Sequence, residues 1–141
     1  EDKATALFIA CQRGNIDIIK MLVNKHQFNF NEKDKEGKTI LHHACEWDNK
    51  NVIQYIISLG KMNCTICDNN GQNVLHLACQ KSDLDLIEYL IGLNEFDINL
   101  ADKKGKTILH YAIEKNNFEI ANYLIKLDQI DFTRKTKDGY T

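Results

Sequence analysis

Residues 37–46 read GKTILHHACE, and this stretch identifies the fold because it returns twice. Residues 71–80 read GQNVLHLACQ and residues 105–114 read GKTILHYAIE, so each copy begins 34 residues after the one before it. Self-similarity at a fixed period of this size is typical of a solenoid, in which one structural unit is repeated and stacked on its neighbours.

The same period runs along the whole chain. Identical residue types recur every 34 positions in five columns: Gly37, Gly71, Gly105 and Gly139; Leu7, Leu41, Leu75 and Leu109; His42, His76 and His110; Ala10, Ala44, Ala78 and Ala112; Asp34, Asp68 and Asp102. We therefore predict one domain made of units at about residues 3–36, 37–70, 71–104 and 105–138, followed by the start of a further unit. Because the chain begins and ends in the same phase of the repeat, we expect a fragment of a longer array or of a larger protein.

Each unit predicts two helices and a loop. In the second unit Thr39 is a suitable N-cap for a short helix, and the apolar residues of NVIQYIISL at 51–59 recur with helical spacing. Asp48 lies between these segments, and its equivalents are also residues that tight turns prefer: Gly14, Ser82 and Asn116. The unit closes with an extended stretch, MNCTICDNNG, at 62–71. The predicted fold is thus an all-α repeat solenoid, each unit being a helix-turn-helix followed by an extended β-turn or hairpin finger.

This unit resembles the ankyrin repeat, whose signature is roughly D-x-x-G-x-T-P-L-H-x-A-A. The matching residues are Asp34, Gly37, Thr39, Leu41, His42 and Ala44 in one unit, and Asp102, Gly105, Thr107, Leu109, His110 and Ala112 in another. The chain departs from the family pattern in four respects: it has no proline, its period is 34 where the family usually has 33, Phe8 replaces the first histidine, and Asn73 replaces one threonine. Proline at the first helical position is a preference set by its fixed φ, so its absence does not argue against the fold.

Composition and charge exclude several classes of function. Hydrophobic residues are 43% and charged residues 27% of the 141, and the formal net charge is −2. These values suit a globular chain and do not point to nucleic acid or to direct insertion into a membrane. The five cysteines are odd in number and sparse, which favours a reducing compartment. We expect the protein inside the cell, in the cytoplasm with the nucleus as the alternative.

The histidine column raises the question of a metal site. Histidine and cysteine three residues apart share one helix face, and four such ligands would suit Zn²⁺. The pairs concerned are His42 with Cys45 and His76 with Cys79. The two columns vary independently, however, because His110 stands with Ile113, and Cys11 stands with Phe8. We therefore interpret the histidines as structural and the cysteines as small apolar core residues. The ankyrin resemblance implies that such a histidine hydrogen-bonds within its turn and to the neighbouring repeat.

A lone C-x-x-C, formed by Cys64 and Cys67, is the other candidate for chemistry. Cys64 falls in an apolar column and Cys67 in a column expected to be exposed, so we do not expect a working pair. The sequence contains no G-x-S-x-G, P-loop, H-E-x-x-H or G-x-G-x-x-G. We predict a protein that is not an enzyme and that needs no cofactor or metal.

A solenoid of this kind is expected to bind through its concave face. The ankyrin resemblance places the variable positions of that face at the finger tips and just after each first helix. The candidates are Lys35, Glu36, Lys38, Glu46, Trp47, Asn69, Asn70, Gln72, Gln80, Lys81, Lys103, Lys104, Lys106 and Lys115. Trp47 is predicted to be exposed and to anchor a partner, the alternative being that it packs over a neighbouring turn.

The lysines at 103, 104, 106 and 115 predict a basic end of the face, suited to an acidic partner segment; the alternative is a solvated lysine-rich surface. The resulting hypothesis is a monomeric protein–protein interaction module. The alternative is a targeting or regulatory segment of a larger enzyme, channel or secreted effector whose activity lies outside this chain. Nucleic-acid binding through the lysines is the least favoured hypothesis, because few aromatic residues interleave with them.

Overall fold

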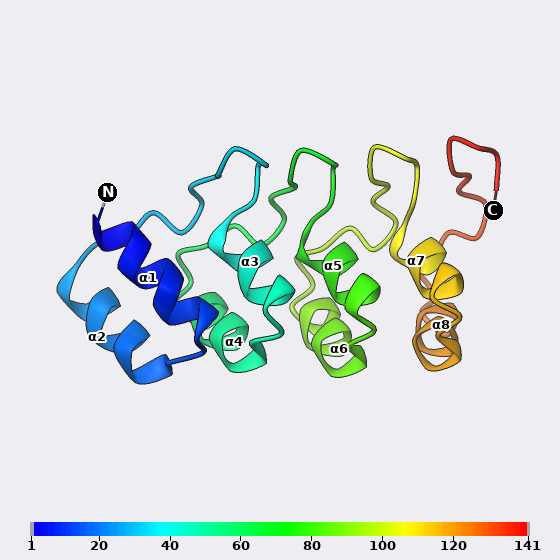
Figure 1. Cartoon of the computed structure of the whole chain (residues 1–141). Coiled ribbons are helices and arrows are strands. Elements are labelled where there is room, and N and C mark those ends of the chain that lie inside the picture. The colour runs from blue at the N-terminus through cyan, green and yellow to red at the C-terminus, as the bar shows by residue number, and fades with distance from the viewer. Residues whose placement is uncertain (1, 141) are drawn as a thin grey trace.

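The computed structural model describes residues 2–140, with side chains from residue 5 onward. Within this range it contains eight helices and no strand, so the prediction of an all-α repeat stack is confirmed (Figure 1). The helices are α1 (Asp2–Gln12), α2 (Ile16–Lys25), α3 (Ile40–Glu46), α4 (Lys50–Ser58), α5 (Val74–Lys81), α6 (Leu84–Gly92), α7 (Ile108–Glu114) and α8 (Phe118–Ile125). They form antiparallel pairs that stand side by side in one row, and the extended loops project along one edge of that row.

The turn inside each helix pair depends on one residue in the left-handed backbone region. Asp48 has φ 60° between α3 and α4, and Asn116 has φ 51° between α7 and α8. The equivalent residues are Gly14 with φ 67° and Ser82 with φ 62°. Glycine, asparagine, aspartate and serine are common at such turns, and the first three tolerate this conformation best. The predicted position of the tight turn is therefore confirmed in all four helix pairs.

The core lies between the two layers of helices. In the second pair, Leu41 and Cys45 of α3 are buried against Ile53 and Ile56 of α4. The cysteine column is fully buried, since Cys11, Cys45 and Cys79 are 0%, 1% and 0% exposed. Each pair buries its apolar faces partly against the next pair, so stability depends on stacking. The expectation that these cysteines serve as core residues is confirmed.

The loops that follow the second helices form four fingers, at residues 29–38, 63–72, 97–106 and 131–140. An aspartate shapes the turn of the first finger: Asp34 Oδ1 accepts the main-chain N–H groups of Glu36 and Lys38, at 2.8 and 2.9 Å. Asp68 and Asp102 make the same pair of bonds in the next two fingers. The aspartate column is thus a turn-forming element.

The first unit differs from the others at its start. α1 spans 11 residues, whereas α3 and α7 span 7. Lys3 occupies the position at which the later units have Gly37, Gly71 and Gly105, all of them with positive φ. Without glycine the chain does not make the finger turn there, and it continues as helix.

Candidate binding face

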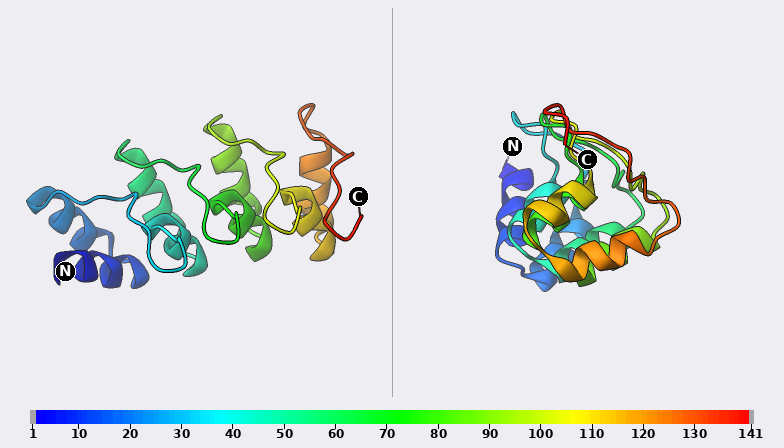
Figure 2. Two further views of the ribbon diagram at one scale, coloured as in Figure 1. Left: turned by 90° about the horizontal axis from the view of Figure 1, so that it is seen from above. Right: turned by 90° about the vertical axis from the view of Figure 1, so that its right-hand side faces the viewer.

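The first helix of each pair and the fingers together form one face of the stack, which is called the inner face (Figure 2). Its helices α1, α3, α5 and α7 contact one another in sequence. The fingers are joined to each other by main-chain hydrogen bonds: Asn69 N–H donates to Glu36 O at 2.9 Å, and Lys103 N–H donates to Asn70 O at 2.8 Å. The last step is Lys137 N–H to Lys104 O at 2.9 Å. These bonds fix the fingers in one row.

The recurring histidines connect helices to fingers. His42 Nδ1 accepts the main-chain N–H of Thr39 at 3.2 Å, because an N–H group can only donate. Its Nε2 therefore carries the proton and donates it to Gln72 O at 3.1 Å. His76 makes the equivalent cap bond to Asn73 and reaches Leu100 O at 3.0 Å. Burial lowers the pKa of both imidazoles, which keeps them neutral.

These bonds bear on the zinc alternative. Both ring nitrogens of His42 and of His76 already have protein partners. Among residues 5–140 no group of three or more His, Cys, Asp or Glu side chains is arranged to hold a metal ion. His42 and His76 thus have structural roles, whereas His110 caps its helix through Nδ1 and its buried Nε2 has no hydrogen-bond partner among the described residues.

The cysteines of the C-x-x-C do not form a matched pair. Cys64 is buried, with 4% of its surface exposed, and Cys67 is partly buried where full exposure was expected. Both are free thiols. Burial raises the pKa of Cys64 to about 11 and also raises that of Cys67, so neither is an activated thiolate.

An aromatic cluster occupies the α1–α3 end of the inner face. Trp47 stacks on His43, with ring centroids 5.5 Å apart, and Phe8 of α1 meets both rings edge-on, at 4.6 Å from His43 and 5.0 Å from Trp47. Trp47 is therefore only partly exposed, and the prediction of an exposed tryptophan is wrong. The reason is that Phe8, which stands where the other units have histidine, turns its ring toward α3. Offset and edge-on aromatic contacts of this kind are favourable.

Ion pairs surround this cluster. Lys38 Nζ lies 2.7 Å from carboxylate oxygens of both Glu36 and Glu46, and these bonds raise the pKa of Lys38. His43 Nε2 lies 2.7 Å from Asp34 Oδ2. Burial alone would raise the pKa of Asp34, but the main-chain N–H of Lys38 and the His43 side chain lower it overall. Three of the predicted site residues, Glu36, Lys38 and Glu46, are thus paired with one another.

A polar network joins the second and third fingers to α7. Tyr111 O–H donates to Asp102 Oδ2 at 2.6 Å, and Gln72 Nε2 donates to the Tyr111 oxygen at 2.5 Å. Lys106 pairs with Glu114 at 2.6 Å and lies 5.7 Å from the centre of the Tyr111 ring. Gln72 and Lys106, both predicted site residues, are therefore held by their neighbours.

The remaining predicted residues differ in exposure. Asn69 and Asn70 are exposed at the second finger, and the Asn69 side chain also donates to Lys35 O at 2.9 Å. Lys35 and Lys81 are exposed, whereas Gln80 is partly buried and its Nε2 has no hydrogen-bond partner in the described part of the chain.

The α7 end of the inner face carries a group of exposed lysines. Lys103, Lys104 and Lys115 are exposed, and no ion pair between described residues involves them. Lys135 and Lys137 of the fourth finger are exposed beside them, and sequence reasoning missed both. The period could have found Lys137, because it stands 34 residues after Lys103. The five lysines are called the basic end.

No helix within residues 2–140 is long and apolar enough to cross a lipid bilayer. Comparison with family models gives a match to the model for ankyrin repeats (3 copies) over residues 1–66 and 57–136. A search of curated proteins finds no match. The matched ranges take in nearly the whole chain and contain the helix pairs, fingers and capping histidines of the inner face, so the chain belongs to the ankyrin repeat family.

Proposed function

We propose that this ankyrin-repeat chain acts as a single binding domain that recognises another protein through its inner face and catalyses no reaction itself. Ankyrin repeats are in general protein–protein interaction modules. The observation that carries the proposal is the row of finger-to-finger hydrogen bonds, from Asn69–Glu36 to Lys137–Lys104. A preorganised surface loses little conformational entropy on binding, which favours affinity.

The partner segment is acidic. Lys38 and Lys106 are neutralised by glutamates, whereas the basic end gathers five exposed lysines that form no ion pair with described residues: Lys103, Lys104, Lys115, Lys135 and Lys137. Oppositely charged surfaces speed association and set the register of a bound chain. The formal net charge of −2 argues against a general affinity for nucleic acid, which needs a strongly basic surface.

The acidic partner is tested by titrating a short polyglutamate peptide into the chain by isothermal calorimetry at low salt. The double charge reversal Lys103→Glu/Lys104→Glu should weaken binding about tenfold or more. The matched control is Lys25→Glu/Lys61→Glu, which changes the net charge equally at exposed lysines outside the inner face. Equal weakening by both variants would contradict the proposal, as would tighter binding of single-stranded DNA than of the peptide.

We propose that the protein works as a monomer. We also propose that it works in a reducing compartment, the cytoplasm. The support is the burial of Cys11, Cys45 and Cys79 as thiols at the centre of the stack. Sedimentation equilibrium at increasing protein concentration tests the monomer, and fluorescence microscopy of the tagged chain in its own cells tests the compartment.

A further inference from the structure

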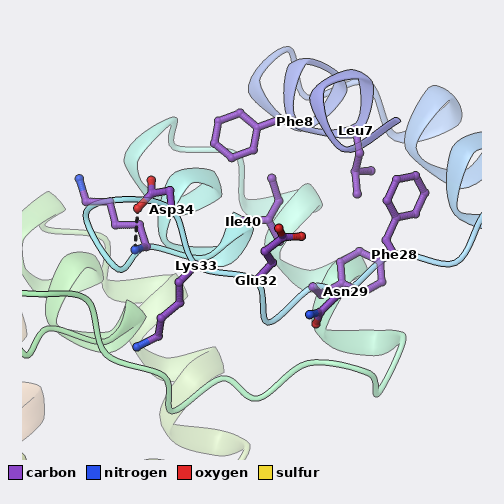
Figure 3. Close-up of a pocket in the computed structure, with 10 residues that line it drawn as sticks. Leu7, Phe8, Phe28, Asn29, Glu32, Lys33, Asp34 and Ile40 are labelled. Atoms are coloured by element: carbon purple, nitrogen blue, oxygen red, sulfur yellow. Dashed lines mark hydrogen bonds between the residues drawn. The ribbon is translucent and has the colours of Figure 1, made fainter. Parts of the chain in front are cut away.

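The first unit contains a cavity at a place where this unit departs from the repeat pattern. It has a volume of about 210 Å³ and opens between α1 and the first finger. In Figure 3, Leu7 and Phe8 project from α1, and Ile40 and Phe28 form the opposite wall. Glu32 lies beside Ile40. Apolar side chains therefore form one part of the lining, and polar or charged residues form the rest: Asn29, Glu32, Lys33, Asp34 and Lys38.

The cavity lies between α1 and the first finger, which correspond to the helix and the finger that a histidine joins in the second unit. In the second unit, His42 of α3 donates to Gln72 O at the end of the following finger. The equivalent residues in the first unit are Phe8 and Lys38, since both stand 34 positions earlier. Phe8 has no hydrogen-bonding atom in its side chain; it lines the cavity, and its ring also contacts His43 and Trp47. Lys38 lines the cavity, and its carbonyl accepts from Asp34 N–H but from no imidazole.

We propose that this cavity receives one aromatic side chain with a hydrogen-bond donor, a tryptophan, tyrosine or histidine, from the acidic protein segment bound on the inner face. The ring would pack on Leu7, Phe8 and Ile40, and its N–H or O–H would reach the Lys38 carbonyl. This is the role that the chain's own histidine performs in the second unit. The inference rests on the proposed function, because the basic end sets where the rest of the segment lies.

The distance between the two subsites fixes the spacing in the partner. The basic end begins at the third finger, two units beyond the first. Packed helices lie about 8–10 Å apart, so two units span about 16–20 Å. An extended chain advances about 3.3 Å per residue, so the aromatic residue and the first acidic residue are separated by about five or six positions.

The test is selection from a random peptide library on the immobilised chain, with peptides of about twelve residues, which are long enough to cover this span. We expect enrichment of Trp, Tyr or His at one position and of Asp or Glu about five or six positions away. The best peptide should then bind the Phe8→His variant at least about tenfold more weakly, because the new imidazole occupies the cavity and takes the Lys38 carbonyl.

Two controls make the result specific. Ile9→His adds an imidazole to the same helix at an exposed position that does not line the cavity, and it should leave peptide affinity unchanged. Circular dichroism should show that both variants are folded, since three other units carry histidine at the position of Phe8.

Each other outcome has a defined meaning. Acidic enrichment without an aromatic position would overturn the cavity proposal and leave the proposed function standing. The cavity proposal would also be overturned if the Phe8→His variant bound the aromatic peptide as tightly as the unchanged chain does. No enrichment of either kind would overturn both proposals.

Discussion

His42 and Gln72 are joined across two units: the imidazole Nε2 of His42 lies 3.1 Å from the main-chain oxygen of Gln72. The same ring caps its own helix through Thr39. One side chain therefore ties a helix start to the neighbouring finger, and the first unit, with Phe8 in its place, lacks this tie. Phe8 takes part in both the aromatic cluster and the lining of the cavity.

Replacing His42 by Ala should destabilise the chain by about 2–3 kcal/mol, because two buried hydrogen bonds are lost and a cavity remains. The measurement is urea unfolding at pH 7.5 followed by circular dichroism. A loss below about 0.5 kcal/mol would show that the tie contributes little.

Stability should fall as the pH decreases below about 6.5. Burial lowers the pKa of His42 and His76 from the ordinary value of 6.5, so the unfolded chain binds protons in a range where the folded chain does not. The contribution of these rings is fully present above 6.5 and is lost as the pH falls from 6.5 toward their folded-state pKa. Urea midpoints between pH 7.5 and 5 measure this, and the slope should be clearly smaller in His42→Leu/His76→Leu. An unchanged slope in the double variant would contradict the assignment.

Gly105 should tolerate alanine poorly. Its φ is 80°, and a Cβ there would lie 2.9 Å from Lys137 N, in the hydrogen bond that joins the third and fourth fingers. Gly60 is the matched control, with φ 64° and open space around the added Cβ. Thermal unfolding should show a cost of about 1–2 kcal/mol for Gly60→Ala and about 1–2 kcal/mol more for Gly105→Ala. Equal losses of stability in the two variants would contradict the expectation that the added Cβ of Gly105→Ala disturbs the contact between the third and fourth fingers.

The five thiols should differ sharply in reactivity. Burial raises the pKa of Cys11 and Cys45 to about 12, and Cys79 is also buried with a raised pKa, while Cys67 is partly exposed. A maleimide at pH 7.5 should therefore label Cys67 first in the folded chain, and all five cysteines in guanidinium. Mass spectrometry of the peptides reads this out. Rapid labelling of Cys45 in the folded state would contradict the packed core.

The fold could be predicted from the sequence because its signals are local and periodic. Asp48 and its equivalents mark the turns, and the apolar spacing of Val52, Ile53 and Ile56 marks a helix face. The histidine bonds followed from the family resemblance, which adds the partner in the next unit that spacing alone does not identify.

The details of the inner face could not be predicted in the same way. Trp47 is partly covered because Phe8, nearly forty residues earlier, lacks the polar atoms of histidine and turns toward it. The sequence predicts Lys106 to belong to the basic end and Lys38 to be a site residue, but each is paired with a glutamate on the adjacent first helix. Contacts between units depend on side-chain conformations, which periodicity does not encode.

Binding of an acidic protein segment at the basic end of the inner face is best tested by amide chemical-shift mapping. A short polyglutamate peptide is added to the isotopically labelled chain, and the shifts are followed residue by residue. We expect the largest changes in the third and fourth fingers, at 97–106 and 131–140, and around Lys115. Changes concentrated on α2, α4, α6 and α8, with the fingers unaffected, would contradict binding at this face.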